Sequence, residues 1–188
     1  MIENLKEEDI EQVLIISDKF IGEKFQTYDS LKNYLQDSHK IIKVFRENDE
    51  IIGFIKGEII EKSELRKSLL KSNPCIDDEL SEEGHMGYAE TICIKEEFRG
   101  TSVAQKLTDE LISSLIKIEN IDIIYTTLWK MGERANAKKL VERTGFKYIT
   151  EIPEYWYSDS LEKNYFCPNC GKPPCKCSMM FYKLARNN

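Results

Sequence analysis

The stretch FRGTSVAQKL, from Phe98 to Leu107, joins a strand-like run to a helix-like run. The residues just before it, ICIKEEF, are typical of a strand. From Ser102 onward, apolar residues recur every three or four positions, which predicts a helix with one apolar stripe. That stripe consists of Val103, Leu107, Leu111, Leu115 and Ile118. The stretch therefore predicts a strand, a tight turn and a long helix in succession.

A turn of this kind gathers several backbone N–H groups that have no partner inside the helix. The helix dipole adds partial positive charge at the same point, so the turn is suited to bind an anion, and best a phosphate. Small residues let a pyrophosphate approach the backbone, and Gly100, Thr101, Ser102 and Ala104 meet that need. Arg99 adds a full positive charge beside them. The alternative is an ordinary turn between strand and helix that happens to hold small residues.

Patterns on either side of this stretch predict a chain that contains both helices and strands, of the α/β (α+β) class with a mixed sheet. Besides the helix after Ser102, helices are expected at about 5–25, 27–37 and 135–146. Strands are expected at 41–49, 50–62, 86–95, 121–130, 146–157 and 179–185, the fifth of them bent at Pro153. Asn48-Asp49 predicts a hairpin between the first two strands. The polar residues 63–84 are expected to form an insertion within a single domain spanning 1–188.

The bulk composition narrows the class of protein. The chain has 188 residues, of which 41% are hydrophobic, and this suits a domain with a sizeable core. No apolar run approaches the length of a membrane span, and the first residues are unlike a signal peptide, so a cytoplasmic protein without membrane contact is expected. The net charge of −6 is spread along the chain and builds no basic face, so no nucleic-acid partner is expected.

The segment Arg99-Gly100-Thr101-Ser102-Val103-Ala104 resembles the acyl-CoA-binding motif of the GNAT superfamily of N-acyltransferases. The family pattern is Arg/Gln-x-x-Gly-x-Gly/Ala, and it lies between a strand and a long helix. ICIKEEF resembles the family's preceding strand. ANAKKLVERTGF, at 135–146, resembles the family's later helix, which typically ends in Leu-Tyr-x-x-x-Gly-Phe. The order of elements is also similar, so the resemblance covers nearly the whole chain outside the insertion and a cysteine cluster.

The resemblance implies a mostly antiparallel, twisted sheet of about six or seven strands with helices on both faces. It implies acetyl-CoA as donor and a primary amine as acceptor, with the pantetheine arm hydrogen-bonded along the strand at Ile92 to Ile94. The cofactor-binding residues that it implies are Ile92, Cys93, Ile94, Arg99, Gly100, Thr101, Ser102, Val103, Ala104 and Asn136. The variable walls of the acceptor pocket are expected in the N-terminal helices, the insertion and the segment around Pro153.

Direct attack by an amine requires that amine to be neutral, so a base or a water relay must take its proton. Glu90 lies two and four residues before Ile92 and Ile94, on the same side by strand alternation, and is the first candidate base. A solvent-facing or salt-bridged glutamate is the alternative. Tyr88 shares that face and is the second catalytic candidate. Cys93 is expected to be a buried, inert thiol.

Two positions depart from the family pattern. Ser102 stands where glycine is usual, and Val141 stands where the family often has a tyrosine that protonates the leaving thiolate. A non-catalytic protein of GNAT type that binds acyl-CoA therefore stays open beside the acetyltransferase. The identity of the acceptor amine stays open, and so does the oligomeric state, with a homodimer among the choices.

A second pattern, Cys167-Pro-Asn-Cys170-Gly-Lys-Pro-Pro-Cys175-Lys-Cys177, places four of the six cysteines within eleven residues. In a cytosolic chain such clustering indicates a metal site before disulfides. Four thiolates make a closed tetrahedral site, so a structural zinc knuckle is expected in the loop 165–178, with iron as another occupant. A redox dithiol is the alternative, but the glycine and prolines of the loop oppose the helix that it needs. A zinc-knuckle interaction module is a third functional hypothesis.

Overall fold

The computed structural model describes residues 1–23 and 25–186, and these form two compact units. Unit 1 consists of Met1–Ile59 and Ala89–Asn120, and unit 2 of Ile60–Tyr88 and the chain from Ile121 onward. The expectation of one domain over 1–188 stays a prediction. Among the described residues, no helix combines the length and the apolar character that a membrane span requires.

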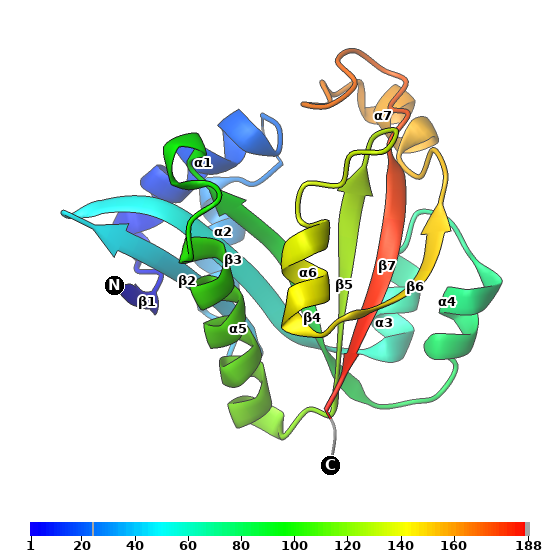
Figure 1. The fold of residues 1–188 in the computed structure, drawn as a ribbon, viewed down its shortest axis with the longest axis horizontal. Helices are drawn as coiled ribbons and strands as arrows, with labels where there is room; N and C mark the ends of the chain where they lie inside the picture. The colour runs from blue at the N-terminus through cyan, green and yellow to red at the C-terminus, as the bar shows by residue number, and fades with distance from the viewer. Residues whose placement is uncertain (24, 187–188) are drawn as a thin grey trace. The chain divides into compact units, whose positions relative to one another are not determined.

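Unit 1 contains four strands and three helices (Figure 1). Its strands are β1 (Ile2–Asn4), β2 (Lys40–Glu47), most of β3 (Glu50–Glu61) and the second half of β4 (His85–Ile94). Its helices are α1 (Ile10–Phe20), α2 (Tyr28–Leu35) and α5 (Val103–Glu119), with 3-10 turns at Glu7–Asp9 and Glu96–Phe98. Asn48 and Asp49 both have positive φ, 48° and 64°, as a two-residue hairpin turn requires. The hairpin predicted at these residues is confirmed.

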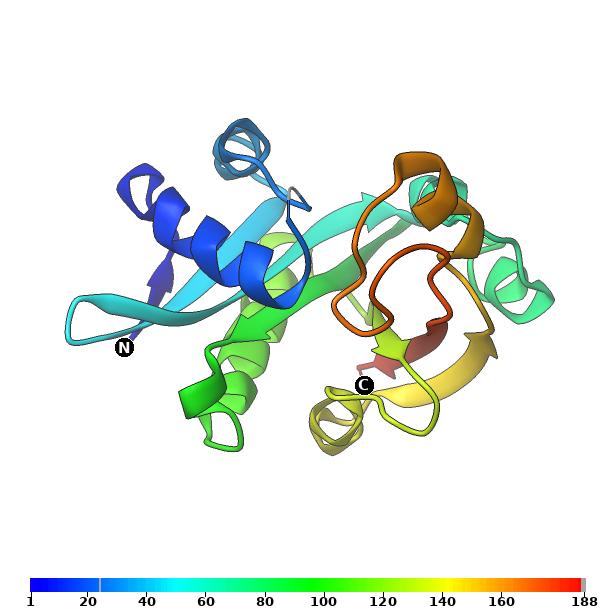
Figure 2. The ribbon, with the colours of Figure 1, turned by 90° about the horizontal axis from the view of Figure 1, so that it is seen from above.

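The two sides of β2 face different helices, because side chains alternate along a strand. Ile42 and Val44 join a buried cluster with Val13 of α1 and Leu31 of α2. Lys43, between them, lies 3.3 Å from the carboxylate of Glu110 in α5. Figure 2 shows α1 and α2 side by side over β2 and β3. Helices therefore cover both faces of the sheet in unit 1.

Gly53 marks a close approach of β3 to β4 within unit 1. A Cβ atom at this position would lie 2.5 Å from Cδ1 of Ile94 and 2.9 Å from the carbonyl oxygen of Cys93. Such distances are far inside van der Waals contact. Only a residue without a side chain lets the two strands pack as they do.

Gly53→Ala is expected to lower the free energy of unfolding by about 1–3 kcal/mol, because the added methyl group overpacks this strand pair. Unfolding in urea measures the effect. The double variant Gly53→Ala, Ile94→Val should regain part of the loss, since it removes the Cδ1 atom. A single variant as stable as the parent protein would mean that β4 shifts freely to make room.

Unit 2 contains the remaining elements (Figure 1). Its strands are the first half of β4, then β5 (Ile123–Lys130), β6 (Lys147–Ile152) and β7 (Ser178–Ala185). Its helices are α3 (Lys62–Ser68), α4 (Pro74–Glu79), α6 (Lys138–Thr144) and α7 (Tyr157–Lys163). The strand β7 pairs antiparallel with both β5 and β6. Gly145 ends α6 with a φ of 102°, as predicted.

The core of unit 2 lies between its strands and the helices α3 and α4. Leu65 of α3 and Ile76 of α4 are buried against Tyr125 and Phe181, whose rings stack 5.1 Å apart. The carboxylate of Glu79, at the end of α4, accepts hydrogen bonds from the Tyr125 hydroxyl at 2.9 Å and from Nζ of Lys183 at 2.7 Å. These bonds fasten the end of α4 to β5 and β7.

The strands are hydrogen-bonded in the order β1-β2-β3-β4-β5-β7-β6, which makes one seven-stranded sheet. The pairs β1–β2, β2–β3, β5–β7 and β6–β7 are antiparallel. The predicted fold class, a mixed and mostly antiparallel sheet with helices, is confirmed.

One predicted strand is wrong in extent. It was expected to run from 146 to 157, but β6 ends at Ile152 and α7, which no pattern predicted, begins at Tyr157. Pro153 has no N–H to offer a partner strand, and Glu154 adopts a positive φ of 49° that turns the chain. The expected insertion 63–84 holds α3 and α4.

Candidate functional site

The loop before α5 joins a strand to a long helix, as expected, but the strand ends at Ile94, earlier than the predicted strand ICIKEEF. A 3-10 turn at Glu96–Phe98 leads into Arg99, and Gly100 follows with a φ of 79°. Space around Gly100 is open, since no atom lies within 4 Å of where its Cβ would stand. Ser102 is the N-cap of α5 and has a φ of −76°. A serine fits this conformation without strain, so its replacement of the usual glycine does not distort the turn.

The first turn of α5 is only weakly capped by the residues before it. The side chain of Ser102 makes no capping hydrogen bond, and the first turn, which is fully described, holds no acidic residue. The hydroxyl of Thr101 donates to the carbonyl oxygen of Phe98 at 2.7 Å, and the amide of Val103 reaches that hydroxyl only at 3.3 Å. A helix start with weak internal capping and no negative charge is suited to an external anion.

Arg99 brings its charge to this loop from a fixed position. Its guanidinium carbon lies 4.3 Å from the ring centroid of Phe20, at the end of α1. Its Nε donates to the carbonyl oxygen of Ile94 at 3.2 Å. The side chain is held at Nε and at its guanidinium, so its charge stands in a fixed position and can contribute to binding a phosphate.

Cys93 is a buried thiol rather than a nucleophile. It is 6% exposed and packs with residues of α1, α2, β2 and β3. Burial raises the pKa of the Cys93 thiol to about 12, despite the opposing charge of Arg99. The thiolate that covalent chemistry needs is therefore scarce near neutral pH, which agrees with the expectation of an inert thiol.

Glu90 and Ile94 lie on opposite faces of the sheet. Glu90 contacts Lys56 of β3 and Tyr34 of α2, on the face that α1 and α2 cover. Ile94 packs at Gly53, whose missing side chain would point to the other face of β3. In a regular strand, residues four apart lie on the same face of the sheet. Because Glu90 and Ile94 do not, the alternation of side chains along β4 is irregular between them. The sequence argument for a shared face was therefore wrong.

Both carboxylate oxygens of Glu90 have partners within unit 1. Oε1 lies 2.6 Å from Nζ of Lys56, and Oε2 accepts a hydrogen bond from the Tyr34 hydroxyl at 3.3 Å. Nζ of Lys56 also lies 5.1 Å from the centroid of the Tyr34 ring. Lys56 is 8% exposed, so this ion pair is largely withdrawn from solvent. The geometry fixes the direction of the Glu90 carboxylate, and no motif in the sequence indicated either partner.

A second carboxylate lies near this ion pair. Burial, followed by the negative charge of Glu90, raises the pKa of Glu58 above its usual range, against the effect of Lys40 and Lys56. Nζ of Lys40 lies 3.7 Å from Glu58 and 5.2 Å from the Tyr34 ring. The cluster thus holds two carboxylates and two ammonium groups around one phenol ring.

The other proposed residues lie in unit 2. The hydroxyl of Tyr88 is 3.0 Å from Oγ1 of Thr127, so β4 and β5 share a hydrogen bond at this point. Asn136 is exposed before α6, and its Oδ1 accepts from Nε of Arg134 at 2.9 Å. Val141, in α6, is 6% exposed and belongs to the buried core.

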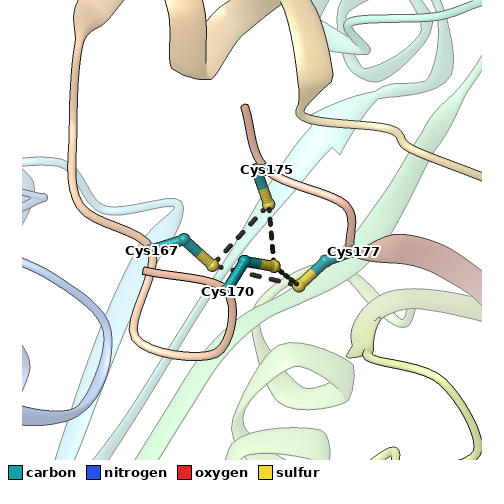
Figure 3. Close-up of side chains that lie close together, drawn as sticks. All are labelled: Cys167, Cys170, Cys175 and Cys177. Atoms are coloured by element: carbon teal, nitrogen blue, oxygen red, sulfur yellow. Dashed lines mark hydrogen bonds between the residues drawn. The ribbon is translucent and has the colours of Figure 1, made fainter. Parts of the chain in front are cut away.

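The four cysteines of the loop 165–178 point toward one another (Figure 3). Their sulfur atoms all lie within 4.8 Å of one another, and four of the separations are 3.2, 3.6, 3.8 and 3.9 Å. Each exceeds a disulfide bond, which is about 2.0 Å long. A tetrahedron of metal–sulfur bonds of about 2.3 Å places its sulfurs about 3.8 Å apart, so the donor set fits zinc.

The protein chain around the cysteines supports such a site. The amide of Lys176 donates to the sulfur of Cys170 at 3.4 Å, as backbone donors do around metal thiolates. Cys167 and Gly171 exchange two backbone hydrogen bonds of 2.8 Å, which closes the first turn of the loop. Cys167, Cys175 and Cys177 are buried, and Trp156 packs against them. The remaining cysteines, Cys75 and Cys93, lie outside this cluster.

Comparison with known proteins identifies the fold. NAA60 of Arabidopsis thaliana in complex with a bisubstrate analogue has 16% identity and a TM-score of 0.69, over 100% of this chain and 98% of that one. Naa20 of Chaetomium thermophilum, also with a bisubstrate analogue, has 11% identity and a TM-score of 0.71, over 99% and 86%. An N-acetyltransferase of Staphylococcus aureus Mu50 has 20% identity and a TM-score of 0.64, over 98% and 97%. At these identities the likeness shows the fold alone.

No curated protein matches the chain in sequence. The model of the acetyltransferase (GNAT) family, however, matches residues 10–146, from the first residue of α1 to the end of the later family motif. This match covers well over half of the chain. The chain therefore belongs to the GNAT family of acetyltransferases.

Proposed function

We propose that this protein is an N-acetyltransferase that transfers the acetyl group of acetyl-CoA to a primary amine. The observation that carries the proposal is the weakly capped start of α5, with Arg99 beside it, in a chain of the GNAT family. NAA60 of Arabidopsis thaliana, which has the same fold at 14% identity, has been solved in complex with acetyl-CoA. That complex supports acetyl-CoA as the donor here.

In this proposal the diphosphate of acetyl-CoA binds the backbone from Gly100 to Ala104, and Arg99 adds its charge. The pantetheine arm follows the backbone of Ile92, Cys93 and Ile94, with Asn136 as a further contact. The slip in side-chain alternation between Glu90 and Ile94 supports this placement, because such irregularities turn backbone groups away from regular strand pairing.

Glu90 is the proposed base, with Tyr88 as the second catalytic candidate. The carboxylate takes one proton from the acceptor ammonium, and the resulting neutral amine attacks the carbonyl carbon of the thioester. The new C–N bond forms as the C–S bond breaks, and the second amine proton goes to the leaving thiolate. Coenzyme A, the amide and a protonated Glu90 result, and Glu90 then returns its proton to water.

Glu90→Gln is expected to lower kcat about 10²-fold at neutral pH, the usual contribution of a positioned base. The affinity for acetyl-CoA should stay unchanged, because the variant leaves the α5 loop intact. Release of coenzyme A thiol measures turnover, and calorimetry measures affinity. Glu58→Gln, which changes the neighbouring carboxylate, is the matched control and should keep kcat within about threefold. An unchanged kcat in Glu90→Gln would reduce Glu90 to a structural partner of Lys56.

A second candidate function is a non-catalytic protein that binds acyl-CoA. The observation that favours it is Val141, a core residue where the family often has a tyrosine acid. Thiol release from acetyl-CoA against a panel of small amines, amino acids and peptides separates the two. Turnover with any member establishes the acetyltransferase, whereas tight binding without turnover by any of them favours the second function.

We further propose that Cys167, Cys170, Cys175 and Cys177 hold one structural zinc ion. The distances between the four sulfurs suit tetrahedral zinc–sulfur coordination. Because all four ligands come from the protein, no coordination position is left for a reacting water. When bound, the metal supplies a cross-link to a loop that buries few apolar side chains of its own. A redox dithiol, an iron site and an interaction module are the competing roles.

The remaining proposals concern the setting of the protein. We propose that it acts in the cytoplasm, where acetyl-CoA and reduced cysteines are both available. We propose an amine-bearing small molecule, peptide or protein as acceptor, with neither nucleic acid nor membrane as a partner. Size-exclusion chromatography with light scattering distinguishes a monomer from a homodimer.

A further inference from the structure

Tyr155 links the four-cysteine loop to a part of unit 2 that is distant in sequence. The backbone amide of Tyr155 donates to the carbonyl oxygen of Cys177 at 3.0 Å. Its hydroxyl accepts a hydrogen bond of 2.8 Å from the amide of Leu70, in the connection between α3 and α4. Tyr155 is 6% exposed, so both bonds are shielded from water. Tyr155 therefore joins Cys177, through its backbone amide, to residues 69–73, through its side-chain hydroxyl.

A second contact reinforces this link. Nζ of Lys71 donates to the carbonyl oxygens of Pro153, at 3.2 Å, and of Glu154. Both carbonyls belong to the turn that leads from β6 to Tyr155. The connection 69–73 is thus held to this turn from two neighbouring positions, and the turn is held to the cysteines.

Aromatic packing ties the same turn to the cysteines. The ring of Trp156 lies against the cysteine cluster and meets Tyr155 edge-on at 4.9 Å and Trp129 at 5.5 Å. The hydroxyl of Ser160, in α7, accepts from the amide of Cys175 at 2.8 Å. The segment from Pro153 to Ser160 therefore takes its position from the four-cysteine loop on one side.

The connection 69–73 has support of its own only at its two ends, where Leu69 packs against the core of unit 2 and Asn73 caps α4. The helices that flank it, α3 and α4, have seven and six residues, too few for stable isolated helices. Glu79 fastens the end of α4, and the ion pair of Arg66 with Asp77, at 2.9 Å, joins α3 to α4. Between them, Leu70 and Lys71 make their hydrogen bonds to Tyr155 and to the turn before it. Without its metal, a loop of four close cysteines loses the cross-link that orders it.

We infer that metal binding at the four cysteines orders the α3–α4 connection through Tyr155, and with it the proposed acceptor wall in the insertion 63–84. This inference rests on the proposed zinc site and on the proposed acceptor wall in the insertion 63–84. Loss of the metal frees the segment 153–160 and then the amides of 69–73. The start of α5, in unit 1, keeps its own hydrogen bonds.

Hydrogen–deuterium exchange on the full chain tests the inference with zinc as the probe. Exchange of the amides in 69–73 is expected to be at least about tenfold faster in the chelated protein than in the zinc-loaded protein, with α5 unchanged. Under the same conditions the KM for the acceptor should rise while the Kd for acetyl-CoA stays the same. Equal protection of 69–73 in both forms, or loss of protection throughout the chain, overturns the inference.

Tyr155→Phe provides the matched variant. It keeps the ring and the backbone bond to Cys177 but removes the hydroxyl that Leu70 contacts, so the Leu70 amide should exchange faster while zinc remains bound. Metal analysis distinguishes failure of the proposed zinc site from failure of the proposed link through Tyr155. A chain that binds no zinc refutes the zinc site. A chain that binds zinc without any change at Leu70 in the variant or on chelation refutes only the link. Acetyl-CoA affinity reports independently on the proposed acetyltransferase.

Discussion

Ser102→Asp is expected to weaken acetyl-CoA binding about 10³-fold while the protein stays folded. The new carboxylate would stand at the N-cap of α5, where the diphosphate is proposed to bind. Two unit charges about 4.5 Å apart repel by about 4 kcal/mol at an effective dielectric constant near 20, and that energy corresponds to roughly three orders of magnitude in Kd. Aspartate is also a favourable N-cap, so the helix itself should gain slightly.

Ser102→Asn is the matched control for this prediction. Asparagine has the same shape and the same capping preference but no charge, so it isolates the electrostatic effect. Its Kd for acetyl-CoA should rise no more than about tenfold. Calorimetry gives both affinities, and thermal unfolding shows that each variant folds. Equal affinity in the aspartate variant and in the parent protein would place the diphosphate elsewhere and remove the basis of the proposed activity.

Cys177→Ser is expected to abolish zinc binding and to lower the Tm by more than about 10 °C. Cys177 is 1% exposed and its sulfur lies 3.2 Å from that of Cys170, so the substitution removes one of four central ligands. Structural zinc contributes its binding free energy to folding, and this amounts to about 10–16 kcal/mol in small zinc peptides. Metal analysis and thermal unfolding measure the two effects.

Cys75→Ser controls for the loss of a thiol. Cys75 is exposed in α4 and lies outside the cluster, so this variant should keep one zinc per chain and the Tm of the parent protein. The same stability in Cys177→Ser and Cys75→Ser, with no zinc in the purified parent protein, would leave the four cysteines without a metal role.

Local sequence patterns predicted the parts of the fold that depend on neighbours in the chain. The apolar stripe predicted from Val103 to Ile118 is buried in α5 as far as Leu115, whereas Ile118 is 41% exposed. Asn48-Asp49 forms the predicted turn, because turn chemistry acts over a few residues. The turn before α5 also followed from local chemistry, since small residues favour such a turn, and its binding of an anion stays a prediction. The cysteine spacing likewise predicted a cluster that the fold assembles.

Contacts between distant residues could not be predicted in this way. Lys56 and Tyr34 belong to separate elements, and only the packing of α2 on the sheet brings them to Glu90. The slip in alternation before Ile94 lies beside the close approach at Gly53, a contact between two strands that neither strand's own pattern encodes. The helix α7 was missed because Tyr155 and Trp156 suggested a strand, whereas Pro153 and Glu154 had already turned the chain.

The N-cap residue of α5, Ser102, makes no side-chain cap, and the Thr101 hydroxyl accepts from the Val103 amide only at 3.3 Å. A missing cap costs a helix about 1 kcal/mol. In the proposed complex the cosubstrate's phosphoryl oxygens would take over that role, so binding of the donor would stabilise the start of α5. The lifetime of the folded protein against unfolding and proteolysis would then increase with the concentration of acetyl-CoA. A shortage of acetyl-CoA would lower the amount of folded protein as well as the amount of cosubstrate.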